Sequence, residues 1–63
     1  MYELSKTILQ KVSFDKTLFR KELTKATKWL NTDEKILLEV WCLGAFGHQY
    51  GEEIIEVFKN IPL

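Results

Sequence analysis

The chain has 63 residues, of which 46% are hydrophobic and 29% charged, and its formal net charge is zero. This length holds one domain at most, so we treat residues 1–63 as a single small domain. The single cysteine, Cys42, excludes an internal disulfide and is typical of a reducing compartment. With no signal-peptide pattern and no apolar run of the ~20 residues that a membrane helix needs, we expect a cytoplasmic protein without membrane contact.

The charges are unevenly distributed. Residues 1–30 carry seven cationic and three anionic side chains, net +4, whereas residues 31–63 carry two and six, net −4. This asymmetry is typical of a nucleic-acid surface, but it equally indicates attraction between the two halves, within one chain or between two.

Apolar residues recur at helical spacing without the alternation of a strand, which predicts an all-α fold. The first helix is expected over about residues 3–12, where Leu4, Ile8, Leu9 and Val12 form one stripe. The second is expected over about residues 16–30, with Asp15 as its N-cap; the competing cap is Ser13.

The third helix is predicted over about residues 33–46, with Asn31 and Glu34 as a capping pair, or Thr32 alone as the cap, at its start. Its wheel is apolar nearly all round, which predicts a central helix covered by its neighbours on most sides. Its short connection to the second helix predicts an antiparallel hairpin of the two. Gly44 suggests a close crossing by another helix, and Gly47 a stop in the left-handed conformation.

A loop or a first loose turn is expected over residues 48–51, followed by a fourth helix over about residues 52–60 that Pro62 prevents from continuing. The sequence therefore predicts a small four-helix domain arranged around a central apolar helix, about residues 33–46.

The second predicted helix carries a basic row made of Arg20, Lys21, Lys25 and Lys28. A row of cations on one helix face suits phosphate binding, which makes nucleic-acid or polyanion binding the alternative function. The competing interpretation is a solvated helix face that also attracts the acidic last helix. Glu22 falls inside the apolar arc of the same helix, without the partner that an acid–base pair needs.

Other reactive side chains do not form a recognisable site. His48, Glu52 and Cys42 lack the spacing and the ligand number of a zinc centre. Cys42 lies in an apolar stretch, which opposes the thiolate that a nucleophile needs. We therefore expect no metal, no cofactor and no enzymatic activity.

Eight aromatic residues are many for so short a chain. The two tryptophans, Trp29 and Trp41, with Phe19 and Phe58, are enough for a small core, and the surplus predicts either tight packing within the chain or an association surface. The candidate interface is an apolar patch made of Leu43, Phe46 and Tyr50. We accordingly predict a non-enzymatic protein-interaction domain that binds another protein or a second copy of itself.

Overall fold

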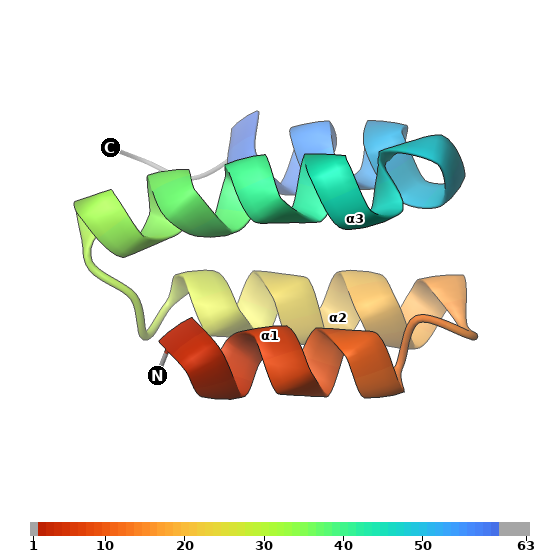
Figure 1. Ribbon diagram of the computed structural model, residues 1–63, viewed down its shortest axis with the longest axis horizontal. Coiled ribbons are helices and arrows are strands. Elements are labelled where there is room, and N and C mark those ends of the chain that lie inside the picture. Colours follow the sequence, from red (N-terminus) through yellow and green to blue (C-terminus); the bar gives the residue numbers. More distant parts are fainter. Residues whose placement is uncertain (1, 60–63) are drawn as a thin grey trace.

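The structure is a computed structural model that describes residues 2–59. It contains three helices, α1 (Tyr2–Lys11), α2 (Lys16–Thr27) and α3 (Thr32–Lys59), and this part of the chain has no strand (Figure 1). The all-α prediction is confirmed, but the prediction of four helices is wrong. The beginnings of all three helices lie within one residue of the predicted positions, whereas α2 ends three residues early.

The predicted third and fourth helices are two arms of α3, a first arm of residues 32–49 and a second of residues 51–59. The predicted loop between them is helical, and only Tyr50 leaves helical geometry, with φ −130° and ψ 24°. The chain turns back on itself at this kink (Figure 1). The predicted helix end at Asn60 lies outside the described residues.

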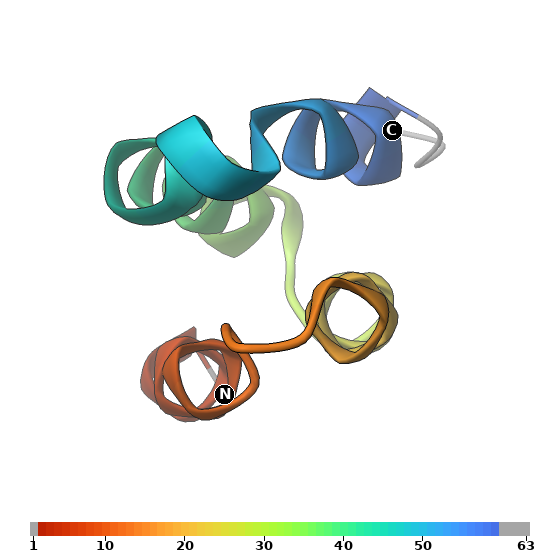
Figure 2. The same ribbon diagram turned by 90° about the vertical axis from the view of Figure 1, so that its right-hand side faces the viewer.

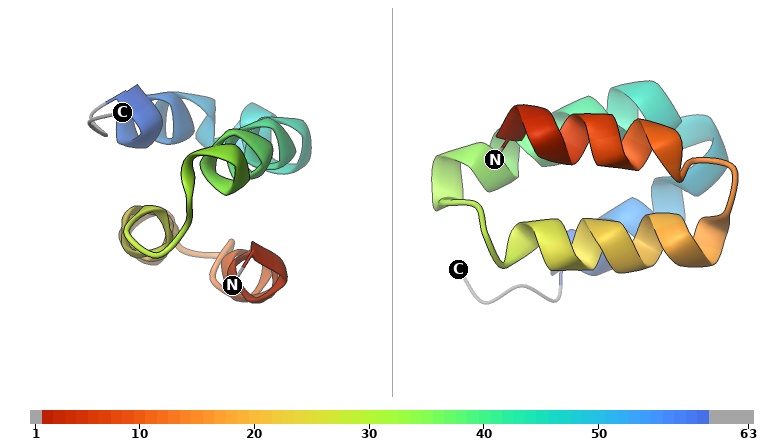
Figure 3. Two further views of the ribbon diagram at one scale, coloured as in Figure 1. Left: turned by 90° about the vertical axis from the view of Figure 1, so that its left-hand side faces the viewer. Right: turned by 90° about the horizontal axis from the view of Figure 1, so that it is seen from below.

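The helical segments form two layers. Helices α1 and α2 run antiparallel in one layer, and the two arms of α3 form the other (Figures 2 and 3). Seen from either end, α1 lies below the first arm and α2 below the second arm.

The predicted caps of α2 and α3 are confirmed. At α2, the Leu18 amide donates to Asp15 Oδ1 at 3.1 Å. At α3, the Glu34 amide donates to Asn31 Oδ1 at 2.8 Å, and the Asn31 amide donates to Glu34 Oε1 at 3.1 Å. This reciprocal capping box satisfies amide groups that the helix leaves without an internal acceptor.

The core lies between the layers. Its fully buried side chains come from all three helices: Leu9, Phe19, Leu23, Leu38, Cys42 and Ile54.

The first arm of α3 is therefore not the enclosed helix that the sequence suggested. Val40 is 66% exposed, and Ile36 and Leu37 are also exposed. Only Leu38 and Cys42 are buried in this arm, because it has neighbours on its inner side alone.

The expected close crossing at Gly44 is wrong too. A Cβ atom added there, or at Gly47, would meet no atom within 4 Å. No described glycine has a positive φ, so Gly47 is not a left-handed helix stop. Glycine disfavours a helix interior by only ~1 kcal/mol, which the packing of both arms overrides.

Candidate functional site: the groove between α1 and α2

The apolar patch predicted from the sequence is largely packed into the core. Tyr50 is 4% exposed, and its ring stacks on Phe19 with the centroids 4.6 Å apart. Phe46 meets Phe19 edge to face at 5.1 Å, and both Phe46 and Leu43 are partly buried against the core. Tyr50 is thus part of the core, whereas Leu43 and Phe46 are half-buried, and a partner-binding role for these three residues stays a prediction.

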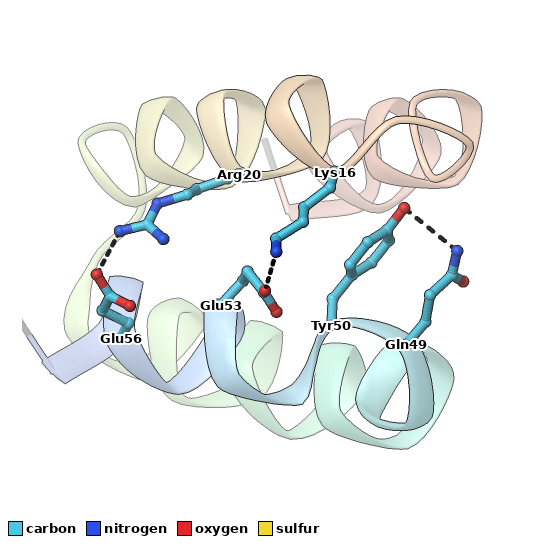
Figure 4. A network of polar contacts seen from close by, with 6 residues as sticks. All are labelled: Lys16, Arg20, Gln49, Tyr50, Glu53 and Glu56. Atoms are coloured by element: carbon cyan, nitrogen blue, oxygen red, sulfur yellow. Dashed lines mark hydrogen bonds and ion pairs between the residues drawn. The ribbon is translucent and has the colours of Figure 1, made fainter.

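Tyr50 also connects the kink of α3 to the turn between α1 and α2. Its phenol donates to the Ser13 carbonyl oxygen at 2.6 Å and accepts from the Gln49 side-chain amide at 3.2 Å (Figure 4). The residue that leaves helical geometry is thus held by a stacked ring and two hydrogen bonds.

The predicted basic row is divided between two roles. Arg20 donates to Glu56, and neighbouring Lys16 lies 3.0 Å from Glu53 (Figure 4). Attraction between the basic helix and the acidic C-terminal segment is therefore confirmed. Exposed cations without an ion pair to any described residue remain further round α2, namely Lys21, Lys25 and Lys28.

The ion pairs shift the pKa values of the side chains that form them. The hydrogen bond from Lys16 lowers the pKa of Glu53, with a backbone amide adding to the effect. The hydrogen bond from Arg20 lowers the pKa of Glu56, and Glu56 in return raises the pKa of Arg20. Both carboxylates are thus held ionised along the contact between α2 and the second arm.

On another side of α2, a groove of about 140 Å³ runs between α1 and α2. Its lining comes from α1, from α2 and from the turn that follows α2: Leu4, Ser5, Ile8, Glu22, Lys25, Ala26 and Trp29. Because α3 contributes nothing to it, the groove opens on the face of the molecule away from α3. Leu4 is 52% exposed and Trp29 66% exposed, so two large apolar side chains border it in contact with solvent.

Trp29 had been assigned to the core from the sequence, and that assignment is wrong. At 100° per residue, Leu18 and Glu22 follow one line along α2, beside the core stripe rather than within it, and Trp29, two residues past the end of α2, lines the groove together with Glu22. The one polar residue in that arc, Glu22, was the sequence signal that this line faces solvent. The groove therefore explains the position of Glu22 without any catalytic role.

The remaining candidates for chemistry find no support in the described residues. No three His, Cys, Asp or Glu side chains of residues 2–59 lie close enough together to hold a metal ion. Cys42 is fully buried, and burial raises the pKa of its thiol to about 12, with Glu39 adding to the shift. A thiol in this state is protonated at neutral pH and shielded from reagents.

Comparisons with protein-family models, curated proteins and solved structures find no match to this chain. None of the helices described by the structure combines the length and the apolar character needed to cross a bilayer. Within the described part of the chain, the α1–α2 groove combines a concave shape with exposed apolar side chains.

Proposed function

We propose that this chain is a non-enzymatic protein-interaction module that binds an amphipathic helix in the α1–α2 groove. The observation that carries the proposal is the exposure of Leu4 and Trp29 on opposite walls of one groove. In helix-in-groove recognition, a partner lays its apolar face into such a groove and anchors it with side chains spaced one turn apart.

Trp29 supplies the largest contact area of this site. Tryptophan is enriched among the few residues that carry most of the binding energy in interfaces, because it buries much surface while ordering only two torsions. The groove volume resembles the ~150 Å³ cavity that admits one benzene molecule. It therefore has room for one or two aliphatic side chains of a partner, whose helix body would lie across the rim.

The charges around the groove favour an acidic partner. Lys25 and Glu22 both line the groove itself, and Lys21 and Lys28 add two further cations on the side of Lys25, so the lysines outnumber the carboxylate. All three lysines are exposed and lack ion pairs within the described chain. A partner helix with carboxylates along one edge of its apolar face would complement them.

The test uses a synthetic helical peptide of about 18 residues, with leucines at i, i+3, i+4 and i+7 and glutamates along one edge. Amide shifts of the isotope-labelled protein are followed during titration with the peptide. We expect the largest shifts at Leu4, Ile8 and Trp29, together with loss of binding in Trp29→Ala. Phe14→Ala is the matched control, since Phe14 is 77% exposed but lies outside the groove.

Two results would contradict the proposal. The first is a set of peptide shifts that spreads over α3 or is unchanged in Trp29→Ala. The second is binding of mixed-sequence DNA or RNA at low salt, lost in Lys21→Gln and Lys28→Gln but kept in Trp29→Ala. Such a pattern would assign the lysine face to polyanions, whose binding depends on cations and falls steeply with salt.

A further inference from the structure

The face of α3 that points away from the α1–α2 layer is apolar and exposed. Ile36 and Val40 each lie about 200° round the helix from buried Leu38, so they point outward. Leu37 beside them and Ile55 on the second arm are exposed to a similar degree. Nothing in the described chain covers these four side chains.

This outer face of α3 also carries carboxylates. Of the six anionic side chains in residues 32–59, Glu53 and Glu56 pair with α2 and do not belong to this face. Asp33 and Glu52 are exposed and form no ion pair with any residue in the described range. Asp33 lies on the same line of the first arm as Val40, and Glu52 lies one turn before Ile55.

The α1–α2 layer and α3 lie on opposite sides of the molecule (Figure 2), so its two exposed apolar surfaces face in opposite directions. One is the α1–α2 groove beside unpaired lysines, and the other is the outer face of α3 beside unpaired carboxylates. An aliphatic side chain such as Val40 or Ile36 is of the size that the groove admits.

From this complementarity we infer that the partner in the groove is a second copy of the same chain, docked through the outer face of its α3. The inference rests on the proposed function, because it uses the same groove. Val40 and Ile36 of one copy enter the groove beside Trp29 of the other, and Lys21 and Lys25 face the carboxylates of the incoming α3.

This contact joins two different surfaces, so it is heterologous. A heterologous contact leaves one groove and one α3 face free at the ends of each dimer, and it extends into open chains or closed rings. Assembly should therefore grow with protein concentration. It should weaken as salt screens the exposed charges, since the Debye length falls from ≈ 10 Å at 0.1 M to 3 Å at 1 M.

The test is sedimentation of the wild type and of two charge variants, each checked for wild-type helicity by circular dichroism. The groove variant is Lys21→Glu with Lys25→Glu, and the α3-face variant is Val40→Ser with Glu52→Gln, which adds no cation that could attract the altered groove. We expect wild type to form species larger than a dimer, and each variant alone to associate at least about tenfold more weakly. An equimolar mixture should form 1:1 dimers and stop there, because only one intact groove and one intact α3 face remain in each pair.

The inference is overturned if wild type stays monomeric at the highest soluble concentration. It is also overturned if either variant alone associates like wild type, or if the mixture forms no dimer. The peptide titration distinguishes failure of this inference from failure of the proposed function. If the protein is monomeric but its groove binds the acidic peptide, the interaction role stands and the partner is a different protein.

Discussion

Two sides of α2 differ in how many of their side chains are buried or paired within the described chain. On the side that meets α3, Phe19 is fully buried among aromatic rings, and Lys16 and Arg20 are paired with glutamates (Figure 4). On the side that borders the groove, Trp29 is exposed and Lys25 has no ion pair within the described chain. One side of α2 thus packs against the rest of the fold, and the other side keeps exposed side chains.

This difference separates stability from binding. Substitutions on the α3 side should lower the free energy of unfolding, because they remove buried contacts or hydrogen bonds. Substitutions on the groove side should leave stability nearly unchanged and alter association instead. The expected loss of stability falls from the buried aromatic contacts of the α3 side to its ion pairs.

Phe19→Ala should have the largest effect. The side chain is fully buried and contacts the rings of both Phe46 and Tyr50, and a buried Phe→Ala change removes about 3–5 kcal/mol. A domain this small has little stability to spare, so the variant should be largely unfolded at room temperature. Urea unfolding followed by circular dichroism measures the change. Phe14→Ala, its exposed counterpart, should stay within about 0.5 kcal/mol of wild type.

Tyr50→Phe tests the connection between the kink of α3 and the α1–α2 turn. The change keeps the ring stacked on Phe19 but removes the hydrogen bond to the Ser13 carbonyl, so we expect a loss of about 1 kcal/mol. Amide exchange should accelerate around residues 47–51 while the remainder of α3 stays protected. Unchanged stability together with unchanged exchange would show that the phenol does not hold the kink.

Asn31→Ala removes the capping side chain at the start of α3. The amide of Glu34 loses its acceptor, and such losses typically lower stability by about 1 kcal/mol. Asn31→Asp should retain most of the stability, since a carboxylate oxygen accepts the same hydrogen bond and complements the helix dipole. Equal losses in both variants would mean that the capping geometry is not the source of the effect.

The smallest expected effect is the pH dependence of the paired glutamates. Both pKa values are lowered in the folded protein, so the pairs stabilise it at pH values above the ordinary glutamate pKa. That stabilisation is lost as the pH falls through the lowered folded-state values.

Thermal unfolding across the acid range measures this effect on wild type and on a double variant, Glu53→Gln with Glu56→Gln. The wild-type advantage should be present at neutral pH and absent in strong acid. An advantage that stays constant with pH would contradict the assignment of these ion pairs.

Local chemistry made part of the fold predictable from the sequence. Asp15 and the pair Asn31 and Glu34 are capping residues at the correct positions, so both helix beginnings were found. The opposite charges of the two halves also predicted attraction between the basic helix and the acidic segment, which Arg20 and Glu56 form.

The errors came from features that depend on tertiary structure. The sequence predicts a helix stop at Gly47 and a break over residues 48–51, but the departure from helical geometry lies at Tyr50, whose ring and hydroxyl have partners far away in sequence. The first arm of α3 is apolar on most sides, which predicted an enclosed helix. A helical wheel shows which sides are apolar, but it does not show which of them are buried. Val40 lies on an exposed apolar side.

The groove was missed for the same reason. The sequence places Trp29 in the core with the other large aromatic residues, although the polar Glu22 lies on the same side of this segment. Only the packing of α1 beside α2 shows that this side borders an open groove.

The division between a structural and a binding side of α2 is tested most directly by measuring two quantities on Trp29→Ala. These are its free energy of unfolding in urea and its affinity for the acidic amphipathic peptide. We expect unfolding within about 0.5 kcal/mol of wild type, as for an exposed side chain, together with loss of peptide binding. A loss of more than about 2 kcal/mol in stability with peptide affinity intact would contradict the account, because Trp29 would then belong to the core.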